Sequence, residues 1–164
     1  MPDKSTIEKA RKDKAEGKSA STQAGEFVHD EIEKVRKGKH GVRSAKQAIA
    51  IGLSEARRAG VKLPPPKNGS PELKKKVRQD EERARSHKPV SQKRSRARIK
   101  ALKKEPTNTV SSAALSKQAK SASKQRSASD RSKAAKKAAR TKGPKKRSAA
   151  ARKGAKTRAR NQKK

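Results

Sequence analysis

The sequence contains no cysteine, tryptophan or tyrosine and only one phenylalanine, Phe27. Without cysteine, the chain can form neither a disulfide framework nor a thiolate metal site. Proteins that bind single-stranded nucleic acids stack bases on aromatic side chains, and one phenylalanine is too few for such a surface. The first 18 residues also lack the apolar run of a signal peptide or a transmembrane helix. We therefore expect a cytoplasmic protein with no membrane partner.

Large apolar side chains are scarce as well. Of the 164 residues, 26 are alanine and only 18 are valine, isoleucine, leucine or phenylalanine, and 11 of these 18 lie within residues 1–66. So few large apolar side chains can bury only a small apolar surface. The burial of this surface does not offset the conformational entropy that a chain of this length loses on folding. The composition therefore predicts a mostly disordered protein with a small all-α head at its N-terminal end.

Positive charge, in contrast, is abundant. The chain has 50 lysines and arginines against 15 acids, a net charge of +35. Residues 1–66 have a net charge of +6, and residues 67–164 have +29. Such charge density attracts polyanions, namely DNA, RNA or, less often, an anionic membrane surface, and of these we expect a nucleic acid as the partner.

Helix signals in the head predict a helical hairpin. Ser5 and Glu8 fit a capping box that opens a polar helix ending near Gly17. Apolar residues then recur at helical spacing over about residues 22–37 and again over about residues 45–59, the second helix starting at a capping box of Ser44 and Gln47. The two expected apolar stripes are Ala24, Val28, Ile32 and Val35, with Phe27 beside them, and Ala45, Ile49, Leu53 and Ala56. A short loop joins these helices, so we expect them to be antiparallel.

Ile51 lies off the second stripe and leaves two alternatives open. With Ala48 it could form a second contact surface through which the head forms a homodimer, since a hairpin of about forty residues is small for autonomous stability. It could instead pack on Ile7 of the polar helix.

The rest of the chain has few folding signals. We expect a head over residues 1–63, a proline-rich linker over residues 64–69, marginal basic helices over residues 70–106 and a disordered Lys/Arg/Ala/Ser tail over residues 107–164. The tail contains an internal repeat: RSKAAKKAARTK at residues 131–142 is similar to RSAAARKGAKTR at residues 147–158, with a period of 16 residues.

The repeat-bearing tail supplies the candidate nucleic-acid-binding residues. Each phosphate that a lysine or arginine neutralises releases condensed counterions, which favours binding at low salt. Base discrimination requires side chains held rigidly against a groove, and Gly143, Pro144 and Gly154 suggest no rigid element. The candidates are Lys133, Lys136, Lys137, Arg140, Lys142, Lys145, Lys146, Arg147, Arg152, Lys153, Lys156, Arg158 and Arg160.

The head offers a secondary contact candidate. If the two hairpin helices formed a helix-turn-helix, the second would present four bases to a groove, namely Arg43, Lys46, Arg57 and Arg58. The loop is long for that motif and the stripes favour antiparallel packing, so the alternative is a solvated basic face.

No pattern of catalytic or cofactor-binding residues is found. His29, His40 and His87 have no spacing that converges on a metal ion, and no phosphate-binding glycine motif occurs. We therefore expect a non-enzyme with no cofactor, no metal and no small-molecule substrate.

The segment from Ser21 to Lys67, which includes RSAKQAIAIGLSEARRAG, resembles the core of an uncharacterised family of small bacterial proteins with Lys/Arg-rich tails. Such proteins are often labelled DNA-binding or plasmid-stabilisation proteins, which implies a bacterial cytoplasm. The KAAKKAA run from Lys133 to Ala139 is similar in composition to histone-like tails.

These observations favour sequence-nonspecific DNA binding of a nucleoid-associated, histone-like kind, with double-stranded DNA as the expected partner. Two alternatives remain open. The chain could be an RNA- or ribosome-associated basic protein, or its head could be the protein-interaction module of a regulatory or plasmid-maintenance complex.

Overall fold

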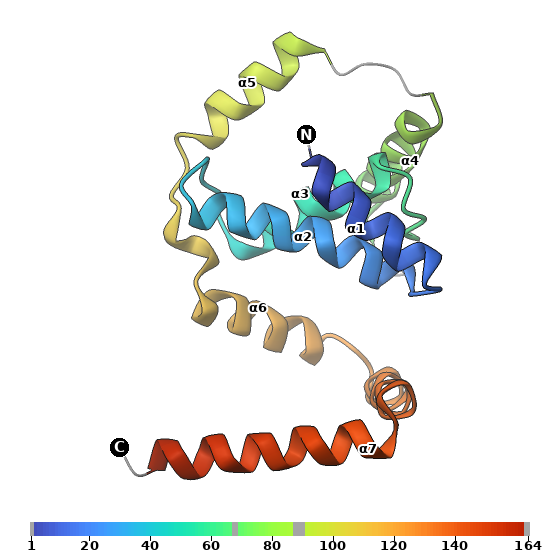
Figure 1. Ribbon diagram of the computed structural model, residues 1–164. Coiled ribbons are helices and arrows are strands. Elements are labelled where there is room, and N and C mark those ends of the chain that lie inside the picture. The colour runs from blue at the N-terminus through green and yellow to red at the C-terminus, as the bar shows by residue number, and fades with distance from the viewer. Residues whose placement is uncertain (1, 67–68, 87–90, 163–164) are drawn as a thin grey trace. The chain divides into compact units, whose positions relative to one another are not determined.

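The computed structural model describes residues 2–66, 69–86 and 91–162, and it is 78% helical, with seven α-helices and no strand in those ranges (Figure 1). The expected fold class, a mostly disordered protein with a disordered tail, is therefore wrong. Alanine, lysine and arginine, which are abundant in the later sequence, have high intrinsic helix propensity. In addition, Val77 and Val110 are buried, although they lie beyond the expected head.

The chain divides into two compact units, Met1–Gln118 and Ala119–Lys164. The first contains the helices from α1 (Lys4–Ala15) to α5 (Gln92–Leu102), and α6 (Ser112–Lys124) crosses the boundary in the sequence. Parts of the expected linker and of the expected marginal helices, at residues 67–68 and 87–90, lie outside the described residues, as does His87.

The first helix, α1 (Lys4–Ala15), begins two residues earlier than its expected capping box predicts. Asp3 is the N-cap residue, and no side chain forms a cap hydrogen bond there, so Ser5 and Glu8 do not form a capping box. Gly17 follows the helix in a left-handed conformation (φ 70°), as expected for a helix end. Ile7 and Ala10 pack on the neighbouring helices, so α1 is part of the folded unit despite its polar sequence.

The expected hairpin is formed by α2 (Ala20–Arg36) and α3 (Ala45–Arg58). Ser44 caps α3 by accepting a hydrogen bond from the backbone amide of Gln47, 3.3 Å away. The side-chain Oε1 of Gln47 in turn accepts from the backbone amide of Arg43 at 2.7 Å, one residue before the position of an ideal capping box. The sequence thus located this helix start within a residue.

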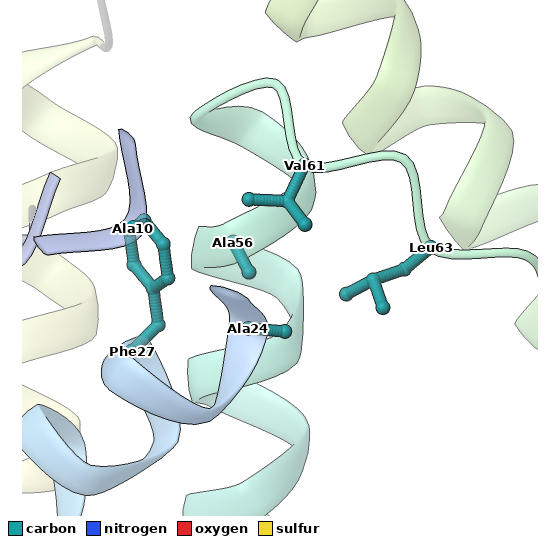
Figure 2. Packing of buried hydrophobic residues seen from close by; sticks show 6 residues of the cluster. All are labelled: Ala10, Ala24, Phe27, Ala56, Val61 and Leu63. Atoms are coloured by element: carbon teal, nitrogen blue, oxygen red, sulfur yellow. The ribbon is translucent and has the colours of Figure 1, made fainter. Parts of the chain in front are cut away.

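The buried stripe of α2 is rotated from the expected one. Ala24, Phe27, Glu31 and Val35 are buried, whereas Val28 and Ile32 are partly exposed. The core around Phe27 lies between α1, α2, α3 and the segment that follows α3 (Figure 2). Its members are Ala10, Ala24, Phe27, Ala56, Val61 and Leu63.

A second core forms where a distant segment, residues 102–110, folds back on the hairpin loop. We call this segment the clasp. The carbonyls of Leu102 and Pro106 accept hydrogen bonds from the amides of Gly41 and Val42, each at 3.0 Å. The Thr109 hydroxyl donates to the carbonyl of Val42 at 2.7 Å. The expected tail therefore begins with a structured element that completes the first unit.

The clasp settles the two alternatives for Ile51. Ile51 is buried in the second core with Val35, Val42, Ala48 and Val110, and Leu102 packs against this cluster. Ile7 belongs to the first core. Ile51 therefore neither packs on Ile7 nor forms a free surface for dimerisation, since the clasp covers it.

The fourth helix, α4 (Pro71–Ser86), docks on α3 rather than being marginal. Val77 is buried, and Asp80 is 1% exposed. The Ser54 hydroxyl donates to Oδ2 of Asp80 at 2.5 Å, and Arg58 and Lys76 lie within 3.8 Å and 3.6 Å of its other oxygen. The buried carboxylate is compensated by one hydrogen bond from Ser54 and by the charges of Arg58 and Lys76.

Candidate nucleic-acid interface

The thirteen bases expected to bind nucleic acid lie on α7 (Ala128–Gln162). This element consists of two helical halves that meet at Gly143, whose backbone is non-helical (φ 68°, ψ 167°) and which Pro144 follows. A positive φ favours glycine, and proline suits a first helical turn because no amide donor is needed there. The expectation that this region has no rigid element is wrong, since each half fixes the directions of its side chains.

The 16-residue repeat of the sequence coincides with the two halves of α7. Its first copy precedes Gly143 and its second follows Pro144. Both copies have three bases at positions i, i+1 and i+4, which fall within about 100° on a helix. These triplets are Lys136, Lys137 and Arg140 in the first half, and Arg152, Lys153 and Lys156 in the second. The repeat therefore builds the same basic face twice, and we call these two surfaces the basic faces of α7.

Further bases extend each basic face. Lys133 adds one turn to the first face, and Lys145, Lys146 and Arg160 lengthen the second. The side of the first half opposite its basic face is rich in alanine, at Ala134, Ala135, Ala138 and Ala139, and also carries Arg131 and Lys142. Three of the expected bases, Lys142, Arg147 and Arg158, point away from the basic faces by their helical position. The structure thus brings ten of the thirteen candidates onto two faces.

The basic faces carry charge that nothing within the unit neutralises. All the bases of α7 are exposed, and within the described part of this helix none forms an ion pair. The single acid in residues 119–164 is Asp130, against 19 bases. An open hollow of about 770 Å³ lies along the second face and is lined by Lys145, Arg152, Lys153 and Lys156. A multiply charged anion would find unpaired cations at regular spacing here.

The four bases of the secondary candidate do not form one surface. Arg57 is only 8% exposed, and its Nε donates to the carbonyl of Leu63 at 3.3 Å. Arg58 donates to the carbonyl of Ser54 at 3.2 Å and approaches Asp80. Arg43 is exposed and lies 3.3 Å from Glu105 of the clasp, and Lys46 is exposed. Arg57 and Arg58 are therefore committed to packing within the first unit.

A cluster of buried charge surrounds Glu31 on α2. The Oε2 atom of Glu31 lies 3.6 Å from Nε2 of His40, and Glu55 of α3 is also buried. Burial raises the pKa of Glu31, and the charge of Glu55 raises it further, whereas His40, Lys34 and Arg98 lower it. Charged or titratable side chains of α2, α3, the hairpin loop and α5 therefore influence one another around Glu31.

Lys34 stabilises this region of α2. Its ammonium forms an ion pair with Asp30 at 2.7 Å and lies 3.9 Å from Asp3. Burial alone would lower the pKa of Lys34, but the hydrogen bond to Asp30 and the charges of Asp30, Glu55 and Asp3 raise it. Among the described residues, no three or more His, Asp or Glu side chains are arranged to hold a metal ion.

Sequence reasoning missed one basic surface, on α5 (Gln92–Leu102). The composition of this stretch predicts a basic helix but does not single out any binding residue. The signal was the spacing i, i+3, i+7 and i+10, which places four bases on one side of a helix. They are Lys93, Arg96, Lys100 and Lys103.

Comparison with known proteins places only the N-terminal part of the chain. Residues 5–67 match the model of a family of unknown function (DUF6496). No curated protein and no solved structure matches the chain. The matched residues cover α1, α2 and α3, so the basic surfaces of α5 and α7 lie outside them. No helix in the described ranges has both the length and the apolar character needed to cross a bilayer.

Proposed function

We propose that this protein binds double-stranded DNA without sequence preference, through phosphate contacts of the basic faces of α7, and that it coats and compacts DNA in the nucleoid. The observation that carries the proposal is the duplicated basic face, whose lysines and arginines are exposed and have no acidic partner within the helix. Binding would release the counterions condensed on the phosphates, which is the main source of affinity in nonspecific complexes.

The burial of Phe27, the single aromatic residue of the sequence, favours duplex over single-stranded nucleic acid as the target. Phe27 is fully buried in the first core, so no aromatic side chain is available to stack on exposed bases. The resemblance of residues 21–67 to proteins labelled DNA-binding agrees with the proposal without carrying it.

The test compares two variants of the full chain that remove the same charge. The first replaces Lys136, Arg140, Arg152 and Lys156, on the basic faces, with glutamine. The second replaces Arg131, Lys142, Arg147 and Arg158, which lie off these faces. Glutamine retains high helix propensity, so both variants should keep α7 helical. Affinity for a labelled duplex of about 30 base pairs is measured by fluorescence anisotropy at several salt concentrations.

We expect the basic-face variant to lose affinity by at least about 30-fold, with the salt slope reduced by roughly 3 to 4, since each lost phosphate contact removes about 0.9 from the slope. The off-face variant should lose less than about threefold. Two unrelated duplex sequences should bind alike. Equal losses in both variants, or no binding of the unmodified protein at physiological salt, would reject the proposed interface. Much tighter binding of duplex RNA would reassign the partner.

A further inference from the structure

We infer that the first unit carries a second duplex-binding surface, on α5, so that one molecule can hold two DNA segments at once. This inference rests on the proposed function, because it takes the same ligand. The inference goes beyond the proposed function because α7, the interface proposed above, belongs to the other unit.

The helix α5 has two chemically different sides. Arg94 lines a hollow of about 440 Å³ together with Gln79, Glu82, Arg83 and Ser86 of α4. Arg98, one turn further on, lies close enough to Glu31 to lower its pKa. Both arginines are exposed, but each lies near an acidic side chain of the first unit.

The opposite side of α5 carries bases without such neighbours. Lys93, Arg96, Lys100 and Lys103 are all exposed, and within the described residues none of them forms an ion pair. By helical position their mean direction lies roughly 160° from that of Arg94 and Arg98. Lys104 continues this row beyond the helix end. We call these five residues the α5 stripe.

The clasp positions the α5 stripe. The carbonyl of Leu102, at the end of α5, accepts a hydrogen bond from the amide of Gly41, and the Leu102 side chain packs on the second core. A side chain at position 41 would collide with the backbone of Glu105, so this close approach requires glycine. The stripe is thus attached to the folded hairpin rather than to a free chain.

The dimensions of the stripe fit a duplex. From Lys93 to Lys104 it extends about 16 Å, since a helix rises about 1.5 Å per residue. The major groove of DNA is about 12 Å wide, so bases at the two ends of the stripe can reach phosphates on both of its edges. Ile99 is 46% exposed between Arg96 and Lys103 and offers apolar contact without aromatic stacking. A polyanionic duplex matches this row of unpaired cations by charge.

Distribution of charge between the units supports two interfaces rather than one. The first unit has a net charge of +17 and the second +18. A single phosphate-binding tail on a neutral head would concentrate the charge in the tail. Two duplex-binding surfaces on one chain would join separate DNA segments, and the second contact would benefit from the high effective concentration that the first creates.

The experiment uses the full chain and two matched variants with the same charge loss. The α5 variant replaces Lys93, Arg96, Lys100 and Lys103 with glutamine, and the control variant replaces Lys4, Lys9, Arg11 and Lys12, which are exposed on α1. Beads carrying one duplex are incubated with protein and then with a second, labelled duplex. The readouts are the labelled duplex retained and the affinity for one duplex in solution.

We expect the α5 variant to retain at least about fivefold less labelled duplex than the unmodified protein, while it still binds one duplex through α7. The α1 control should behave like the unmodified protein. A variant with arginine at positions 93, 100 and 103 keeps the charge and should retain the second duplex. Adding the α5 substitutions to the basic-face variant of α7 should abolish its residual binding.

Retention by the α5 variant equal to that of the unmodified protein would overturn the inference. Equal loss in the α1 control would also overturn it, since charge alone would then explain the result. Failure of the proposed function would appear in a different measurement, because the basic-face variant of α7 would then bind a single duplex as tightly as the unmodified protein. Far-UV circular dichroism, together with the arginine variant, separates loss of the surface from loss of the fold.

Discussion

At the scale of single residues, Gly52 sets how closely α2 and α3 approach each other. A Cβ atom at this position would lie 2.7 Å from the Cα of Val28, 2.9 Å from its backbone nitrogen and 3.0 Å from the carbonyl oxygen of Phe27. Backbone atoms cannot move away as a flexible side chain can. Gly25, on the exposed side of α2, has nothing within 4 Å of such a Cβ.

These two glycines give a matched pair of substitutions. We expect Gly52→Ala to destabilise the protein by about 1–3 kcal/mol, because the helices must separate. Gly25→Ala should stabilise it by about 0.5–1 kcal/mol, because alanine has the higher helix propensity and meets no neighbour. The free energies of unfolding come from urea titrations followed by circular dichroism. Equal effects of the two substitutions would show that helix propensity, not the helix crossing, decides the result.

Glu31 gives a prediction about pH. Burial and the charge of Glu55 raise its pKa above the ordinary carboxyl value, against the opposing charges of His40, Lys34 and Arg98. Between the ordinary and the raised pKa, the folded state binds more protons than the unfolded state, so this group makes stability fall as pH rises through that interval. At neutral pH the buried charge remains as a cost.

We therefore expect Glu31→Gln to raise the melting temperature at pH 7, with an advantage that shrinks as the pH falls toward the ordinary carboxyl range. Glu8→Gln, which removes an exposed charge from α1, is the control and should show no such trend. Melting temperatures at several pH values make the comparison. A Glu31→Gln protein that is less stable at every pH would mean that the interactions with His40 and Arg98 outweigh the cost of burial.

At the scale of elements, the clasp is the least expected part of the first unit. It has a single fully buried large side chain, Val110, in the three-residue helix η1 (Asn108–Val110). Arg36 of α2 donates to the carbonyl of Val110 at 3.4 Å, and Thr109 holds the hairpin loop. The sequence does not indicate this element, because the residues that the clasp contacts lie about 70 positions earlier in the chain.

Truncation of Val110 should show what the clasp contributes. We expect Val110→Ala to cost about 2 kcal/mol, from lost burial and the cavity that remains. Ile99→Ala removes a larger side chain that is 46% exposed, and it should cost well under about 1 kcal/mol. Amide hydrogen exchange at Gly41 and Val42, whose amides bind the clasp, would report its release. Unchanged exchange in Val110→Ala would contradict this role of the clasp.

The two halves of α7 raise a different question at the same scale, because they are helical without a buried residue. Alanine, lysine and arginine favour helix, whereas bases four residues apart on the basic faces repel each other. The Thr141 and Thr157 hydroxyls bond to carbonyls one turn earlier, at 2.9 Å and 3.0 Å. Intrinsic helix propensity therefore maintains these helices, and bound phosphates would relieve the repulsion.

For the whole molecule, charge is spread more evenly than the sequence halves suggest. Dividing the chain at residue 66 makes the head look nearly neutral and the tail look like the only polycation. The folded boundary lies after Gln118, so α4, α5 and the clasp bring their bases to the first unit. A molecule with two comparably basic units fits DNA bridging better than a head with a passive tail.

The sequence by itself determined the local features of this protein. Capping at Ser44, glycine after α1 and α2, the helical hairpin, the repeat and the strong positive charge all follow from neighbouring residues and composition. The sequence also predicted marginal basic helices over residues 70–106, where α4 and α5 form, although not that α4 docks on the hairpin. The bases of α7 could be named from the sequence, but not their division into two faces and three off-face residues.

Tertiary structure decided the rest, because the deciding contacts join residues far apart in the chain. The burial of Ile51 depends on the clasp, that of Asp80 on Ser54 and Arg58, and that of Arg57 on the carbonyl of Leu63. The small number of large apolar residues predicted disorder. Composition cannot show that apolar residues from distant segments pack into two small clusters within one unit. Which bases are free to bind a phosphate, and which are consumed by packing, is therefore a property of the fold.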